Sequence, residues 1–163
     1  MKTITESEAL SRVAFYCSSA EHCRYEVEEK LRKWSLDEQA IGRILQKLES
    51  ERYVDDDRYC RAFVADKINF AKWGKMKISR ALSLKKIDDE IIQKYLLQID
   101  EDEYKAMLRH LIAEKKRTIK GGNEYQIQGK LIRFAVGVFR HSLSFKAKGV
   151  KVIPGFIAGS IRQ

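Results

Sequence analysis

The chain has 163 residues, of which 44% are hydrophobic and 34% charged, with 32 Lys and Arg against 23 Asp and Glu. This length is enough for an ordinary folded domain with a core, and one proline with nine glycines argues against a β-rich or disordered chain. No stretch approaches the roughly 20 apolar residues that a membrane helix needs, and the N-terminal residues hold no apolar signal core. We therefore expect a helical, cytoplasmic protein that does not bind a membrane.

The excess of positive over negative charge lies in the second half of the chain. Residues 1–66 carry 11 Lys and Arg against 14 Asp and Glu, whereas residues 67–100 carry 8 against 4 and residues 101–163 carry 13 against 5. An ordinary solvated surface would explain a basic chain, but it would not explain a charge that is graded along the sequence. The gradient favours a polyanion, or an acidic protein groove, as the partner of the C-terminal part.

Helix signals recur along the first third of the chain. Thr5-x-x-Glu8 has the pattern of a capping box, and the apolar residues behind it recur at helical spacing as far as Ser18-Ser19. A second helix is predicted over about residues 22–33. A third follows to about residue 48, and either Ser35 or Asp37 could be its N-cap.

The second and third helices belong to a pattern that occurs twice. The two segments, residues 24–48 and 75–99, share a helical pattern with an offset of 51. Its apolar positions Val27, Leu31, Leu36, Ile41, Leu45 and Leu48 match Ile78, Leu82, Ile87, Ile92, Leu96 and Ile99, and Asp37 matches Asp88. A fixed internal period indicates a repeated supersecondary unit. The three helices of the second copy are predicted over residues 56–71, 76–84 and 88–99.

A third copy is predicted after these two, but it is incomplete. Asp100-x-x-Glu103 is another capping-box pattern and opens a long seventh helix, which ends in a basic run before Gly121-Gly122. An eighth helix is predicted from Tyr125 to about Val136. Gly137 stands where the other copies have their aspartate, so the tail over residues 138–163 is expected to leave the helical pattern.

These signals predict an all-α fold of tandem three-helix repeats, of which two are complete and the third is incomplete or divergent. The expected domains are residues 1–54, 55–100 and 101–163, with a divergent tail after about residue 137.

Three consecutive aspartates, Asp55 to Asp57, stand at the join between the first two repeats. They could suggest a metal site, but no second acidic cluster lies nearby in the sequence to complete a divalent-metal shell. Carboxylates at a helix N-terminus cap free N–H groups and meet the positive end of the helix dipole, so we interpret them as capping residues. Tyr53 and Val54 are then expected to pack between two repeats.

The sequence offers no convincing catalytic or metal site. Cys17, Cys23 and Cys60 are irregularly spaced and lack a second paired set of ligands, so reduced structural thiols are expected. The chain has neither the lysine-serine ending of a P-loop nor a nucleophile elbow. We therefore expect a protein that is not an enzyme and that uses no cofactor and no metal.

Basic residues interleaved with apolar ones are the strongest functional signal. Phosphate neutralisation requires such charge, although it carries no sequence information. The candidate binding residues are Lys67, Lys72, Lys75, Lys77, Arg80, Lys85, Lys115, Lys116, Arg117, Lys120, Lys130 and Arg133. Phe70 and Trp73 could stack on bases, but both stand at the end of an amphipathic helix, where core packing is the expected role.

The join between the repeats resembles a motif of a known family. Tyr53-Val-Asp55-Asp56-Asp57-Arg58-Tyr59 is similar to the tyrosine–acidic–arginine motif of the RecX family, bacterial regulators of the RecA recombinase. Cys23-Arg24-x-Glu26-Val-x-x-Lys30-Leu31 resembles the second helix of that family's first repeat, and Gly74-x-x-Lys77-Ile78-x-x-x-Leu82-x-x-Lys85 resembles the same helix of its second repeat. The resemblance covers residues from about 9 to 136.

The resemblance implies a curved, elongated molecule that binds in the groove of the RecA–DNA filament. It implies that strand exchange and ATP hydrolysis are blocked, or that the filament is disassembled, and that DNA is also bound directly. The basic residues would then contact RecA or DNA, whereas the motif, Tyr53, Asp55, Asp56, Asp57, Arg58 and Tyr59, would be structural. We expect a monomer that acts in recombination regulation, DNA repair and the SOS response.

Two departures from the family pattern stand out. Lys86 replaces the glycine that the family usually has before the apolar residue Ile87, and the tail after about Gly137 does not resemble the family's closing helix. The alternative functions are a general basic DNA-binding helical module without RecA specificity and a helical scaffold for another acidic protein.

Overall fold

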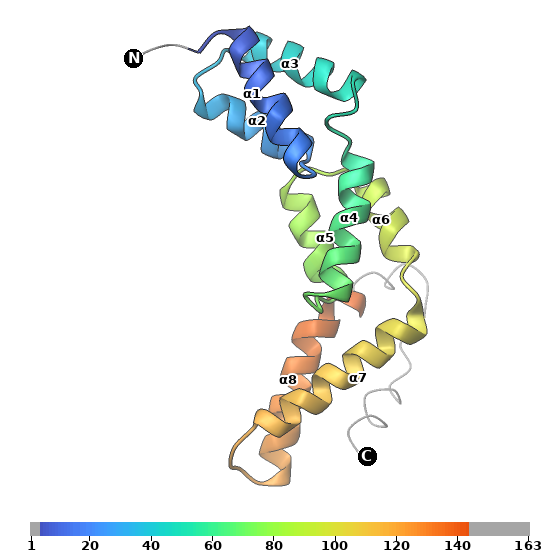
Figure 1. Ribbon diagram of the computed structural model, residues 1–163. Coiled ribbons are helices and arrows are strands. Elements are labelled where there is room, and N and C mark those ends of the chain that lie inside the picture. The colour runs from blue at the N-terminus through green and yellow to red at the C-terminus, as the bar shows by residue number, and fades with distance from the viewer. Residues whose placement is uncertain (1–3, 144–163) are drawn as a thin grey trace. The chain divides into compact units, whose positions relative to one another are not determined.

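The computed structural model describes residues 4–143, with side chains as far as Ala135 and at Val138, and these residues form helices and turns without a strand (Figure 1). The prediction of an all-α chain is confirmed. The helices of the described range are α1 (Glu6–Ser19), α2 (Arg24–Lys33), α3 (Glu38–Ser50), α4 (Asp56–Asn69), α5 (Lys75–Leu84), α6 (Asp89–Leu97), α7 (Glu101–Thr118) and α8 (Glu124–Leu143).

The helix boundaries reproduce the sequence repeat. The first residues of α2 and α5 are 51 positions apart, and so are those of α3 and α6. The match extends to the caps: the Asp37 carboxylate accepts a hydrogen bond from the Ala40 amide at 2.8 Å, and that of Asp88 accepts one from the Glu90 amide at 2.9 Å. The repeated sequence pattern is therefore a repeated pair of helices.

The side-chain caps explain where several helices begin. At α1 the predicted capping box is present, since Thr5 accepts from the Glu8 amide at 3.3 Å and Glu8 accepts from the Thr5 amide at 3.1 Å. At α3 the cap is Asp37, while Ser35 has a φ of 58° at the end of α2. The choice that the sequence left open is therefore settled in favour of Asp37.

Contacts within the chain divide it into two compact units. Unit 1 consists of residues 1–66 and 81–95, and unit 2 consists of residues 67–80 and 96–163. The unit boundaries pass through α4, α5 and α6, whereas the predicted domain boundaries follow the sequence repeat. The division into three repeat domains therefore stays a prediction.

The core of unit 1 lies between α1, α2 and α3, where apolar residues at helical spacing are almost fully buried. Its main members are Ala9, Val13, Val27, Leu31, Ile41, Ile44, Leu45, Leu48 and Val54. Tyr53 is 37% exposed, so the prediction that it packs between two repeats is wrong for this residue. Both residues follow α3 in a segment that is not helical.

Unit 2 is built around α7 and α8, which lie side by side (Figure 1). Tyr104 and Leu108 of α7 and Leu131 and Ala135 of α8 are buried. The loop between these helices contains Gly121 and Gly122, both with positive φ, as expected for a helix stop.

Two predicted helix ends differ from the structure. The fourth helix ends at Asn69 rather than at residue 71, and α8 continues to Leu143 instead of stopping near Val136. A glycine inside a helix costs about 1 kcal/mol relative to alanine, and the preceding turns of α8 are anchored by buried residues, so Gly137 does not end it. The rest of the predicted tail, residues 144–163, lies outside the described residues.

Candidate functional site

The three aspartates of the motif each bind a different helix of unit 1. Asp55 caps α4, because its Oδ1 accepts a hydrogen bond from the Arg58 amide at 3.0 Å. Asp56 caps α2, since its Oδ1 accepts from the amide of Arg24, the first residue of that helix, at 2.8 Å. One short segment therefore satisfies N-terminal amides of two helices, one of them 32 residues earlier in the chain.

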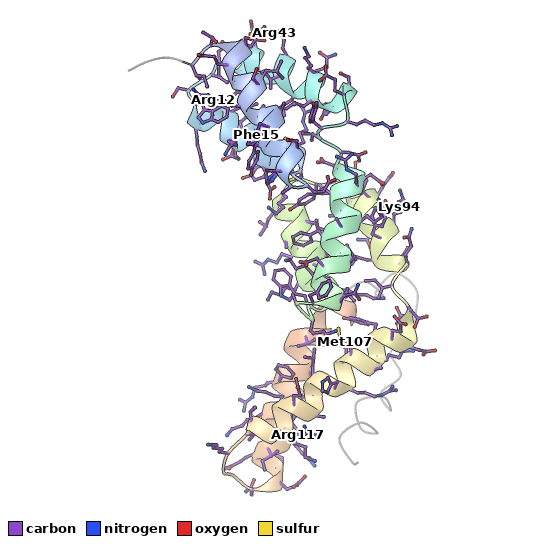
Figure 2. All side chains as sticks on the ribbon, viewed as in Figure 1. Arg12, Phe15, Arg43, Lys94, Met107 and Arg117 are labelled. Carbon is purple, nitrogen blue, oxygen red and sulfur yellow. The ribbon has the colours of Figure 1, made fainter. Side chains whose placement is uncertain are left out.

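Asp57 connects α4 to α6. Its Oδ1 lies 2.7 Å from the Lys94 ammonium, labelled in Figure 2, and its Oδ2 accepts from the Tyr95 hydroxyl at 2.5 Å. These hydrogen bonds lower the pKa of Asp57. Burial raises the pKa of Asp56 instead, and its bond from the Arg24 amide offsets only part of that rise.

The last two motif residues, Arg58 and Tyr59, contact residues that come earlier in the chain. The Arg58 guanidinium lies 2.7 Å from the Glu21 carboxylate and 3.1 Å from the Arg52 carbonyl. The hydroxyl of the buried Tyr59 donates to Glu26 of α2 at 3.2 Å. The motif thus contacts segments on both sides of it in the sequence, all of them within unit 1.

Glu26 is the centre of a half-buried polar cluster that sequence reasoning did not single out as a site. Besides Tyr59, its carboxylate accepts from His22 Nδ1 at 2.9 Å and from the Lys85 ammonium. Burial alone would raise its pKa, but the hydrogen bonds from Lys85 and His22 outweigh burial and lower it. The only sequence signal was the position of Glu26 in the family-like segment of α2.

The cysteines have the properties of core residues. Cys17, Cys23 and Cys60 are buried and free. Burial raises the pKa of all three thiols, that of Cys60 to about 11, so they stay protonated and poorly nucleophilic near neutral pH.

In the part of the chain that the structure describes, no group of three or more His, Cys, Asp or Glu is placed to hold a metal. None of the helices described has the length and apolar character of a membrane-spanning segment.

All of the candidate binding residues except Lys85 belong to unit 2. Unit 2 carries 18 Lys and Arg against 6 Asp and Glu, whereas unit 1 carries 14 against 17. Such an imbalance creates a positive potential over unit 2 that attracts polyanions. The charge gradient of the sequence therefore follows the division of the chain into two units.

The candidates Lys75 and Lys85 each form an internal ion pair with a glutamate. Lys75 Nζ lies 2.5 Å from the Glu101 carboxylate and 4.9 Å from the centre of the Tyr104 ring, within unit 2. Lys85 Nζ pairs with Glu26 within unit 1. Both ammonium groups are less available to a partner than the sequence pattern indicated.

The remaining candidates of α7 and α8 lie on the surface of unit 2. The side chains of Lys115, Lys116, Arg117, Lys120, Lys130 and Arg133 are exposed. Arg117 is labelled near the end of α7 in Figure 2, and Lys115 lies 5.6 Å from the ring of Phe134 on α8. The loop between α7 and α8 is therefore flanked by cations on both helices.

The other cations surround the turn between α4 and α5. Lys77 Nζ lies 4.0 Å from the centre of the Trp73 ring, and Lys67 Nζ lies 5.4 Å from it. Phe70 is 82% exposed, so the expectation that it packs in the core is wrong, because α4 ends at Asn69 and Phe70 falls in the turn beyond. Trp73 is half-buried.

Comparison with known proteins gives a consistent result. A family model described as "RecX, second three-helix domain" matches residues 55–96. Regulatory protein RecX of Clostridium beijerinckii is 31% identical over 113 residues, which cover 68% of this chain and 52% of that protein. The chain belongs to the RecX family. The predicted resemblance to the RecX family is thereby confirmed.

Other RecX proteins extend the comparison. Regulatory protein RecX of Oceanobacillus iheyensis is 33% identical over 90 residues, which cover 55% of this chain and 33% of that protein. A solved structure of RecX from Lactobacillus salivarius has a TM-score of 0.75 and 22% identity over 96% of this chain and 94% of that one. A second solved structure, of regulatory protein RecX, has a TM-score of 0.76 and 21% identity over 85% of this chain and 71% of that one. At these identities the solved structures show a shared fold.

The chain spans about a third to a half of the length of the first curated RecX relatives it matches. These relatives are named as regulatory proteins. The RecX family is thus a family of regulators. The described residues of this chain form helices, and polar side chains cap these helices and form ion pairs.

Proposed function

We propose that this RecX-family chain regulates RecA by binding in the groove of the RecA–DNA filament, where it inhibits recombinase and ATPase activity. Family membership is the observation that carries the proposal. The charge difference between the units supports it, since a RecA–DNA filament is a polyanionic partner and unit 2 carries 18 basic against 6 acidic residues. The protein acts as a cytoplasmic monomer through binding, without catalysis of its own.

The exposed cations of unit 2 give the binding its physical basis. Lysine and arginine side chains that neutralise phosphates release condensed counterions, which makes binding strongly dependent on salt. Contacts of this kind position a protein on nucleic acid without reading its sequence, as suits a regulator that must act wherever a filament forms. The motif at Asp55 to Asp57 contributes indirectly, because it holds α2, α4 and α6 in place.

A titration of RecA with this protein tests the proposal. RecA, single-stranded DNA and ATP are mixed with increasing amounts of the chain, and hydrolysis should fall at substoichiometric to near-stoichiometric ratios. Unchanged hydrolysis over a broad range, without filament binding, would contradict the proposal.

A charge-matched pair of variants tests which unit binds. Replacing Lys115, Lys116, Arg117 and Lys120 with alanine should weaken filament or DNA binding and leave helicity intact, because these side chains are exposed. The control replaces four exposed cations of unit 1 with alanine, Arg12, Lys33, Lys47 and Arg61. Equal loss in both variants would show that total charge, rather than unit 2, determines binding.

A general DNA-binding module without RecA specificity is the second candidate, and the basic unit 2 alone favours it. It predicts tight, salt-dependent binding to DNA in the absence of RecA and no effect on RecA ATP hydrolysis. A scaffold for another acidic protein predicts neither of these effects and would be recognised by its partner in a pull-down.

A further inference from the structure

The turn between α4 and α5, residues 70–74, presents aromatic rings to solvent in unit 2. The Phe70 side chain is 82% exposed, and Trp73 is half-buried. A single exposed apolar side chain needs no explanation by itself. This one differs because it lies in a segment whose charged residues are all cationic.

Residues 67–80 contain five Lys and Arg and no Asp or Glu. The ammonium groups of Lys67 and Lys77 lie 5.4 Å and 4.0 Å from the centre of the Trp73 ring, so both are within cation–π distance. Lys72 lies in the turn itself, on an exposed position next to Trp73. Aromatic faces and cations thus occur together over a few residues.

The turn is held against α7 and α8 of the same unit. The amide of Trp73 donates to the Lys67 carbonyl at 2.9 Å, and the amide of Lys75 donates to the Tyr104 hydroxyl of α7 at 3.1 Å. A Cβ atom on Gly74 would lie only 2.8 Å from the Val138 carbonyl of α8, so the backbones approach closely there. The aromatic residues therefore project from a fixed base, which reduces the entropy lost on binding.

We propose that this turn binds single-stranded nucleic acid, with Phe70 stacking on a base while Lys67, Lys72 and Lys77 contact the adjacent phosphates. The proposal rests on the proposed function and adds the form of nucleic acid that the chain contacts. Bases of a single strand expose their faces, whereas those of a duplex are stacked on one another, so an aromatic ring beside cations selects the single strand. An acidic protein surface would use the cations but gains no base to stack on Phe70.

The test compares the full chain with two phenylalanine variants for binding to fluorescently labelled oligo(dT) and to a duplex of the same length. Phe70→Leu keeps an apolar side chain but removes the stacking face. Phe15→Leu is the matched control, because Phe15 is 77% exposed on α1 of unit 1 (Figure 2). Phe70→Leu should weaken oligo(dT) binding about tenfold and leave duplex binding unchanged, and Phe15→Leu should change neither.

Two further readouts separate stacking from charge. With Trp34→Phe as background, Trp73 is the one tryptophan left, and its fluorescence should change on binding oligo(dT) more than on binding duplex. Lys77→Ala should reduce the slope of log K against log salt by about 0.7 for a single strand, whereas Phe70→Leu should leave the slope unchanged.

Several outcomes would overturn the inference. Unchanged oligo(dT) binding by Phe70→Leu would do so, and so would an equal loss on single strand and duplex. Weaker inhibition of RecA with unchanged oligo(dT) binding would instead identify Phe70 as a protein contact. If the wild-type chain leaves RecA unaffected while Phe70→Leu still weakens oligo(dT) binding selectively, the proposed function fails and this inference stands.

Discussion

Replacing Lys86 should reveal the strain at the end of α5. Lys86 has a φ of 56°, in the left-handed region that favours glycine, and its amide donates to the Ser83 carbonyl at 2.9 Å. The next amide, that of the buried Ile87, donates to the Leu82 carbonyl at 3.2 Å. Helices commonly end in this way with glycine at the left-handed position, so the lysine keeps the usual geometry at an energetic cost.

The size of the effect follows from three terms. A residue with a side chain costs about 1–2 kcal/mol in the left-handed conformation, while glycine loses about 0.5–1 kcal/mol more conformational entropy on folding. The Lys86 ammonium also lies 5.1 Å from the Tyr25 ring, a contact of about 0.5–1 kcal/mol at an exposed site. Lys86→Gly and Lys86→Ala both lose that contact, but only glycine removes the strain. Lys86→Gly should therefore be about 0.5–1 kcal/mol more stable than Lys86→Ala and close to the wild type.

Urea unfolding followed by circular dichroism measures this difference, with the alanine variant as the matched control. Thermal unfolding should place the glycine variant a few degrees above the alanine variant, since about 1 kcal/mol shifts Tm by roughly 2–4 °C in a chain of this size. Equal stability of the two variants, or a more stable alanine variant, would refute the left-handed geometry at Lys86.

The remaining predictions concern packing, capping and pH. Gly74→Ala should destabilise unit 2 by about 1–3 kcal/mol, because its Cβ would lie 2.8 Å from the Val138 carbonyl oxygen. Gly42 is at an exposed position of α3, and a Cβ added there would have no atom within 4 Å, so Gly42→Ala should instead stabilise the chain by about 0.5–1 kcal/mol. Urea unfolding that gives the two substitutions a change in unfolding free energy of the same sign would contradict the structure. Asp55→Ala should remove the cap of α4 and lower stability by about 1 kcal/mol, and an unchanged Tm with lost RecA inhibition would show that Asp55 acts in binding instead. The pKa of Glu26 is lowered from 4.5 in the folded chain, so its ionised form adds stability above about pH 4.5, and this stability is lost as pH falls through the folded pKa. Glu26→Gln should therefore make the unfolding free energy depend less on pH in that range. An unaltered pH profile would contradict the role given to the Glu26 cluster.

Local signals made much of the fold predictable. The capping box at Thr5 and the aspartates Asp37 and Asp88 mark helix starts that the structure confirms. The reason is that capping depends on residues only two or three positions apart, so it can be recognised without knowledge of the fold. Helix ends depended more on packing, which is why the end of α8 was placed too early at Val136.

The parts of the site that sequence reasoning missed depend on contacts between distant residues. Asp56 was expected to cap the helix that it opens, but it caps α2, 32 residues earlier. Lys85 looked like a binding residue from its charge, yet its ammonium pairs with Glu26, 59 positions away. Phe70 looked like a core residue from its spacing, yet the helix ends one residue before it. The charge of a residue and its helical spacing do not show which distant residue its side chain contacts in the fold.

Titration of RecA ATP hydrolysis at two salt concentrations tests the central claim most directly. With single-stranded DNA and ATP present, the chain should inhibit hydrolysis at near-stoichiometric amounts at the lower salt concentration and less at the higher one, because the cations of unit 2 contribute the binding. Hydrolysis that stays unchanged over the whole titration at both salt concentrations would contradict the account.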